Sequence, residues 1–114
     1  MITDIDALSA AADEASEFLK SLASPVRLRI LCSIMGKEAS VGELAEQLGV
    51  RQSVASQHLA LLRKDGLVKT RREGQTIWYA LADDRVVRVM DVLQQTFCPA
   101  EEPKAPARRA RARA

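Results

Sequence analysis

The sequence of 114 residues predicts one mainly α-helical domain with a small β-hairpin, followed by a tail. Apolar residues recur at helical spacing through most of residues 6–98. Residues 68–81 are instead rich in Val, Thr, Ile, Trp and Tyr, and a glycine-containing turn divides them. The expected order is therefore four helices, a hairpin and a final helix, all within a domain of residues 1–98.

The middle of the chain predicts two helices joined by a tight turn. Ser40 and Glu43 form a capping box that begins the first helix, and Gly49 ends it. One apolar stripe of this helix faces inward: Val41, Leu44, Ala45 and Leu48. The second helix covers residues 52–65 and ends before Gly66. Its inward stripe is Ala55, Leu59 and Leu62.

The outer face of this second helix is polar. It carries amides, hydroxyls and cations, which can contact base edges in the major groove of DNA or hold phosphates. The candidate DNA-binding residues here are Arg51, Gln52, Ser53, Ser56, Gln57 and His58. His58 has a second interpretation, as a residue that packs between helices. Two helices joined by a glycine-containing turn, with a polar face on the second, are typical of a helix-turn-helix.

The hairpin places a cationic strand beside this pair of helices. Its strands are expected at residues 68–72 and 76–81, with Gly74 in the turn. The cations near its tip are Lys69, Arg71 and Arg72. Because such cations suit the phosphate backbone, Arg71 and Arg72 join the candidate DNA-binding residues. The whole block predicts a winged helix-turn-helix that binds double-stranded DNA. The alternative is an ordinary small α+β core with a solvated basic turn.

Three further helices surround this block. The first is expected at residues 6–22 and the second at residues 25–35, with Ser24 as its N-cap. The last begins at Asp83 or Asp84 and runs to position 97 or 98. The first and last helices carry more apolar surface than one small core can cover, which favours a homodimer on a palindromic operator. The candidate dimer contacts are Leu8, Leu19, Val89, Met90 and Leu93. The alternative is that both helices fold back on their own core.

Charge and composition indicate the kind of partner. Residues 21–79 hold nine cations against five acids, so positive charge collects on the DNA-binding block. The N-terminus lacks the pattern of a signal peptide, and no apolar run approaches the roughly 20 residues that span a bilayer. We therefore expect a cytoplasmic protein with no membrane partner. Residues 99–114 are expected to form a disordered basic tail, either an arm for nonspecific DNA contacts or a solubilising extension.

The sequence gives no indication of catalysis. It contains no Ser/His/Asp set, no paired catalytic carboxylates and no glycine-rich phosphate loop, so neither enzyme activity nor a cofactor is expected. A small dimeric interaction module or an enzyme on a winged-helix scaffold is the competing class. Salt-dependent operator binding would separate a regulator from that class.

The motifs placed above resemble those of the ArsR/SmtB family of bacterial winged-helix repressors. The matching stretches are residues 22–31, 40–45, 53–59, 62–68 and 72–79. The resemblance implies a transcriptional repressor that dimerises through its first and last helices. Arg51 departs from the family, which often has a capping Ser at this position, and an absent cap costs about 1 kcal/mol of helix stability.

The sequence argues against the metal sites of this family. The family's thiolate site uses cysteines in the stretch that corresponds to residues 40–44, where this chain has Ser40 and Gly42. The family's other common site uses His and carboxylate ligands on the last helix, and residues 83–98 contain no His. His58 is the only histidine, and zinc sites need three or four ligands, so no metal is expected.

Cys32 and Cys98 remain as candidate sensing residues. The residues alone support two interpretations equally: two buried, inert thiols, or a reactive pair. The BigR and SqrR branch of the family carries cysteines at both positions, with Phe before the second, as Phe97 stands here. This resemblance implies that a persulfide or polysulfide bridges the two thiols as a disulfide or a longer sulfur chain, which releases DNA. A general thiol-oxidation or metalloid sensor that uses the same pair is the alternative.

Overall fold

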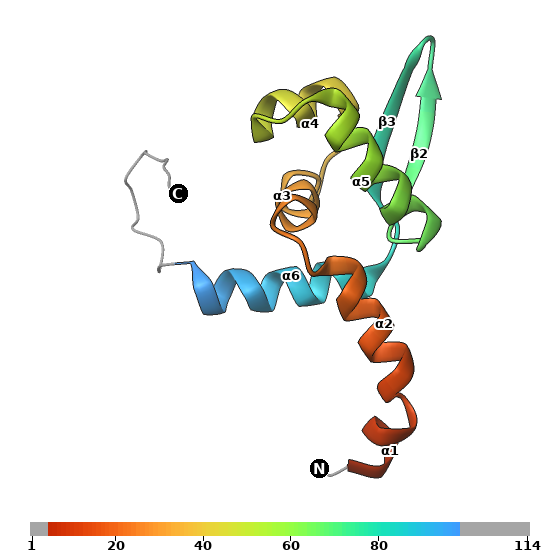
Figure 1. The fold of residues 1–114 in the computed structure, drawn as a ribbon, viewed down its shortest axis with the longest axis vertical. Helices are drawn as coiled ribbons and strands as arrows, with labels where there is room; N and C mark the ends of the chain where they lie inside the picture. Colours follow the sequence, from red (N-terminus) through yellow and green to blue (C-terminus); the bar gives the residue numbers. More distant parts are fainter. Residues whose placement is uncertain (1–4, 99–114) are drawn as a thin grey trace.

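The computed structural model describes residues 5–98, which form a mainly helical domain with a small sheet (Figure 1). The predicted fold class is confirmed, and the predicted tail lies outside the described residues. The elements are α1 Ile5–Ala10, α2 Ala12–Leu22, α3 Pro25–Ser33, β1 Ala39–Ser40, α4 Val41–Leu48, α5 Gln52–Lys64, β2 Val68–Glu73, β3 Thr76–Leu81 and α6 Asp84–Phe97.

The sheet has one strand more than the sequence predicted. Its order is β1-β3-β2, and both pairings are antiparallel. The strands β2 and β3 form the expected hairpin, in which Glu73 pairs with Thr76 across a loop where Gly74 has φ of 63°. The strand β1 consists of Ala39 and Ser40 alone, which is too short for an alternating pattern to reveal. Since β1 leads directly into α4, it joins the wing to the start of the helix-turn-helix.

The two central helices begin and end as predicted. At the start of α4 the Ser40 side chain accepts from the Glu43 backbone N–H, and the Glu43 side chain accepts from the Ser40 N–H. Gly49 then takes φ of 70°, a left-handed conformation that costs glycine little. The recognition helix α5 follows directly and ends one residue before the predicted boundary. Local signals therefore fix this part of the fold.

The N-terminal helices differ from the prediction in two places. The expected single helix over residues 6–22 is divided at Ala11, which has φ of −96° and ψ of 3°. No Gly or Pro marks this break, and α1 has no buried residue to hold it in line with α2. In addition, α3 ends at Ser33 rather than at residue 35, and Gly36 with φ of 76° completes the turn that follows.

The core lies around α3, which contacts α4, α5 and α6. Its largest fully buried side chains are Ile30, Leu31, Ile34, Leu44, Leu59, Leu62, Leu67 and Val86. In Figure 1, α1 and α2 extend away from this body in one direction and α6 in another. Within residues 5–98, none of the helices combines the length and the apolar character needed to cross a membrane.

Candidate functional site

The recognition helix α5 has two distinct faces. Ala55, Leu59 and Leu62 are fully buried against the core, as predicted. The opposite face is solvent-exposed and carries Gln52, Ser53, Ser56 and Gln57. Amide and hydroxyl groups on an exposed helix face can contact base edges and phosphates directly. Arg51 occupies the N-cap of this helix without a side-chain capping bond, which leaves its cation available for another partner.

His58 differs from its neighbours on α5 because it is half-buried and faces α3. Its Nδ1 accepts a hydrogen bond of 3.2 Å from Nε of Arg27. This contact favours the packing interpretation of His58, whereas its place in a DNA interface stays a prediction. Sequence analysis missed Arg27. The available signal was an arginine on a helix whose remaining residues are mostly apolar, because such a cation needs a polar partner where it is buried.

The wing presents its cations unequally. Arg71 forms ion pairs with Glu38 at 2.7 Å and with Glu73 at 2.9 Å. The hydrogen bond from Arg71 lowers the pKa of the Glu38 carboxyl. The hydrogen bonds to Glu38 and Glu73 raise the pKa of the Arg71 guanidinium. A DNA phosphate would therefore compete with two carboxylates for Arg71. Arg72 is also exposed, and within residues 5–98 its side chain donates only to the Gly74 carbonyl, at 3.2 Å.

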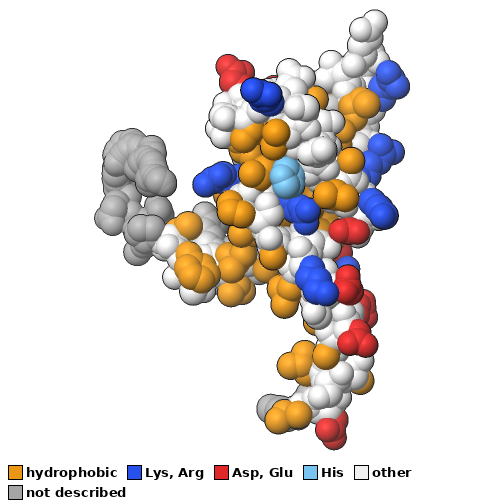
Figure 2. All heavy atoms as spheres, viewed as in Figure 1, with side chains coloured by type: hydrophobic (Ala, Val, Ile, Leu, Met, Phe, Trp, Pro, Cys, Tyr) orange, Lys and Arg blue, Asp and Glu red, His pale blue; other side chains and the backbone are white. Residues whose placement is uncertain are grey.

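The surface separates charge by region. Figure 2 shows Lys and Arg side chains along the edge of the wing and Asp and Glu side chains along the outer edge of α1 and α2. This agrees with the charge division in the sequence. A polyanion would therefore meet favourable potential at the wing and unfavourable potential at the N-terminal helices.

The two cysteines line one apolar groove between α3 and α6. The groove has a volume of about 450 Å³. Its lining consists of Leu28, Arg29, Cys32, Met90, Leu93, Gln94, Phe97 and Cys98. We call it the thiol groove. Within one chain both thiols are free and exposed, so they are not buried as the first of the two interpretations expected.

Cys98 is held at the end of α6. It is the C-cap residue, and its backbone N–H donates to the Gln94 carbonyl at 3.0 Å. Cys32 lies on α3, the helix at the centre of the core. A covalent link between these positions would therefore join the core to the C-terminal helix. Across residues 5–98 there is no group of three or more His, Cys, Asp or Glu side chains that could hold a metal ion.

The outer helices leave large apolar side chains in solvent. Leu8 is 65% exposed and Leu19 is 55% exposed, and Figure 2 shows apolar atoms along α1, α2 and α6. Met90 requires a correction, because it is only 6% exposed within one chain. It shares the inner face of α6 with Val86 and belongs to the core, so it is not an exposed dimer contact. Val89 and Leu93 are half-buried at the edge of this core.

Residues 24–70 match the model of a family described as bacterial regulatory proteins of the arsR family. The transcriptional activator HlyU of Vibrio cholerae is 46% identical over 84 residues, which cover 74% of this chain and 78% of that protein. The chain belongs to the ArsR family. ArsR proteins are DNA-binding transcriptional regulators and not enzymes, so this family assignment confirms the predicted function class.

Two solved structures match more than four fifths of this chain. The repressor BigR from Xylella fastidiosa has a TM-score of 0.80 and 36% identity, over 85% of this chain and 99% of that one. A homodimeric winged helix-turn-helix DNA-binding domain from Mycobacterium bovis has a TM-score of 0.68 and 32% identity, and the match covers 84% of this chain and 89% of that one. These matches confirm the predicted family and its winged helix-turn-helix fold.

Proposed function

We propose that this ArsR protein is a homodimeric repressor that leaves its operator when a persulfide or polysulfide bridges Cys32 and Cys98. The observation that carries the proposal is the thiol groove, in which both cysteines face one apolar space between α3 and α6. The resemblance of both cysteine positions to the BigR and SqrR branch supports the same conclusion.

The proposed DNA interface consists of the polar face of α5 and the wing. Gln52, Ser53, Ser56 and Gln57 would contact base edges, because they are exposed uncharged polar groups at the start of the recognition helix. Arg51 and Arg72 would contact phosphates. Arg71 contributes less, since Glu38 and Glu73 already occupy its guanidinium.

The proposed dimer forms through α1, α2 and α6. Leu8 and Leu19 on the N-terminal helices are exposed, and Phe97 on α6 is 77% exposed. Burying such side chains in a second copy would remove apolar surface from water at roughly 25 cal/mol per Å². The homodimeric relative from Mycobacterium bovis supports this assembly. A two-fold dimer would match a palindromic operator.

The proposed chemistry begins with one thiolate attacking the outer sulfur of a persulfide, R–S–SH. The S–S bond breaks, RSH leaves, and the cysteine becomes a protein persulfide. The second cysteine then attacks the inner sulfur of this persulfide and releases H₂S. The two thiols are oxidised to a disulfide, while the reagent is reduced to RSH and H₂S. Further persulfide equivalents would lengthen the bridge, one sulfur atom each.

The thiol groove suits this chemistry. Its lining is mostly apolar, and Arg29 adds a cation that can attract an anionic persulfide. A bridge would join α3, which packs against α4 and α5, to α6. If α6 forms part of the dimer interface, the bridge would alter how the two DNA-binding heads are set and so lower operator affinity.

The test combines DNA binding with intact-mass measurement. Glutathione persulfide should produce a mass change of two hydrogens lost plus each inserted sulfur, together with at least a tenfold loss of operator affinity. Cys32→Ser and Cys98→Ser should bind the operator when reduced and remain bound after treatment. If Cys32→Ser still releases DNA in response to persulfide, the two-cysteine mechanism is wrong.

A second candidate is a general thiol-oxidation or metalloid sensor that uses the same cysteines, favoured by the exposure of both thiols. Parallel treatment with hydrogen peroxide and with arsenite separates it from the first. Equal release of DNA by persulfide and peroxide would indicate general oxidation. Release by arsenite, with a mass increase that fits one arsenic atom, would indicate metalloid sensing.

A further inference from the structure

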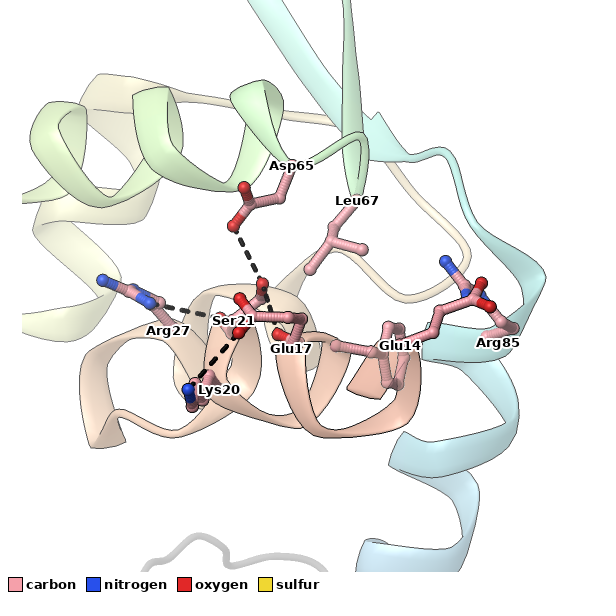
Figure 3. A pocket seen from close by; sticks show the side chains of 9 residues that line it. Glu14, Glu17, Lys20, Ser21, Arg27, Asp65, Leu67 and Arg85 are labelled. Carbon is pink, nitrogen blue, oxygen red and sulfur yellow. Dashed lines mark hydrogen bonds and ion pairs between the residues drawn. The ribbon is translucent and has the colours of Figure 1, made fainter. Parts of the chain in front are cut away.

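The last turn of α2 is hydrogen-bonded to the C-cap residue of the recognition helix and, through Arg27 of α3, to the middle of that helix. Ser21 Oγ donates to Asp65 Oδ2 at 2.8 Å, directly after α5. Arg27 Nη1 donates to the Ser21 carbonyl at 3.3 Å, and Arg27 Nε donates to His58 Nδ1 at 3.2 Å. Figure 3 shows Ser21, Arg27 and Asp65 converging beside an open pocket of about 370 Å³. We call Ser21, Arg27, His58 and Asp65 the α2–α5 tie.

The guanidinium of Arg27 is suited to hold two helices at once. Its Nε–H and Nη1–H belong to one rigid plane, so an acceptor on α2 and an acceptor on α5 fix the orientation of the whole group. The backbone of Arg27 is held as well, because its N–H donates to Oγ of the N-cap Ser24 at 3.3 Å. Arg27 is half-buried, which strengthens its hydrogen bonds relative to those in open water.

The same contacts argue against Arg27 as a phosphate ligand. Two of its donor groups are already satisfied inside the protein, and the side chain is partly removed from solvent. The wing cations other than Arg71 have fewer of their donor groups bonded inside the protein and are more open to solvent. Arg27 therefore contributes to DNA binding through the placement of α5 rather than through direct contact.

We propose that Arg27 is a positioning residue for operator recognition. Through the α2–α5 tie it fixes the angle of α5 against α2. Since α2 is part of the proposed dimer interface, this angle sets the spacing of the two recognition helices against the operator half-sites. The inference rests on the proposed function in one respect, namely that the protein binds a palindrome as a dimer.

The test uses the full chain and a palindromic duplex that the wild-type protein selects from a random-sequence library. The second probe is the same duplex with one half-site scrambled. Arg27→Gln removes the fork and the charge, whereas Arg27→Lys keeps the charge but cannot reproduce the planar fork. Arg88→Gln, at an exposed arginine of α6, is the charge-matched control. Affinities are measured over a series of salt concentrations.

Both Arg27 variants should lose about tenfold in affinity for the palindrome and less for the single half-site, with the wild-type salt dependence. Arg88→Gln should match the wild type. Near-normal binding by Arg27→Lys, with a flatter salt dependence for Arg27→Gln, would identify a phosphate contact and overturn the proposal. Wild-type affinity in both Arg27 variants would also overturn it.

A further variant guards against simple misfolding. Ser21→Ala leaves Arg27 in place and removes the bonds from Oγ to Asp65 and to the Glu17 carbonyl of its own helix, so it should fold and show a smaller loss in the same direction. Equal losses on the palindrome and the half-site would mean that the tie serves stability alone, which contradicts the proposal. If the wild-type protein selects no palindrome, the proposed function fails instead, and that outcome is visible before any variant is made.

Discussion

The DNA-binding head (α4, α5 and the wing) and the outer helices (α1, α2 and α6) satisfy their side chains in opposite ways. In the head, the capping box and the left-handed Gly49 are completed within α4, and the stripe of α5 is buried against α3, α4 and β2, although Leu61 and Ile77 stay partly in solvent. In the outer helices, large apolar side chains and the Cys98 thiol remain exposed. The head is therefore specified largely by the chain itself, while the outer helices leave surface for the partners proposed above: a second copy and a sulfur species.

The helix ends show this contrast only in part, because α5 of the head also begins without a side-chain cap, at Arg51. The α4 helix has reciprocal capping bonds, whereas α2 begins at Ala11 without any side-chain cap. The α6 helix begins at a capped residue, since Asp83 accepts from the Arg85 N–H at 2.8 Å, but it ends on the exposed Cys98. Elements that lack local partners can be shifted by a distant one, which is what a regulatory region requires.

The largest effect is expected from disrupting the proposed dimer interface on the outer helices. Leu19→Asp places a charge on the exposed apolar side of α2, so the protein should sediment as a monomer. Its operator affinity should fall on the order of a hundredfold or more, because the two heads are no longer linked. Gln47→Asp adds the same charge to an exposed polar site of α4, outside the proposed dimer interface, and should remain dimeric. A Leu19→Asp protein that stays dimeric would refute the assigned interface.

The next prediction concerns the head. Gln57→Ala should cost about 1–3 kcal/mol for the operator and relax sequence specificity, because it removes a group that contacts a base edge. Arg72→Ala should weaken binding to all DNA and reduce the salt slope by about 1, because it removes a phosphate contact. Binding to operator and random duplexes across salt concentrations measures both. The assignment fails if the two variants behave alike on both duplexes.

Features that depend on residues close in the sequence were predicted, whereas features that depend on distant residues were not. The capping box, Gly49 and the two stripes of the head involve neighbours in the sequence, and each appears in the structure. The strand β1 escaped prediction because its two residues become a strand only by pairing with β3. The burial of Met90 depends equally on contacts from distant elements.

Polar contacts between distant residues were likewise outside the reach of the sequence. The pairing of Arg71 with Glu38, and that of Arg27 with His58, join residues 33 and 31 positions apart. Hydrophobic periodicity carries no information about such bonds. The joint position of Cys32 and Cys98 came from the family resemblance, and the thiol groove is the structural counterpart of that expectation.

A smaller effect on stability is expected from adding an N-cap to a helix or removing one. Arg51→Ser should stabilise the fold by about 1 kcal/mol, because a serine at the N-cap of α5 can accept a backbone N–H that Arg51 leaves unbonded. It should also weaken binding to random DNA, through loss of a cation. Ser40→Ala is the matched control, because it removes the N-cap of α4 and should lower the free energy of unfolding by about 1 kcal/mol. Urea unfolding measures both. Destabilisation by Arg51→Ser would contradict the capping argument.

The smallest effect concerns the wing. Glu38→Gln should release one partner of Arg71 and raise affinity for random DNA about twofold. Since Arg71 holds the pKa of the Glu38 carboxyl below its usual value of 4.5, the pair persists above that pH. It is lost only as the pH falls through the lowered pKa of the folded state. The gain from Glu38→Gln should therefore be constant from neutral pH down to about pH 5. Unchanged or weaker binding would show that Glu38 does not restrain Arg71.

The most direct test of the central claim follows bridge formation and DNA release in the same samples. Glutathione persulfide is titrated into the protein bound to its operator, and each sample is divided between intact-mass measurement and a binding assay. The fraction of chains with a Cys32–Cys98 bridge should rise together with the fraction of DNA released, and both should be abolished in Cys98→Ser. Release of DNA without the bridge, or a complete bridge with DNA still bound, would contradict the account.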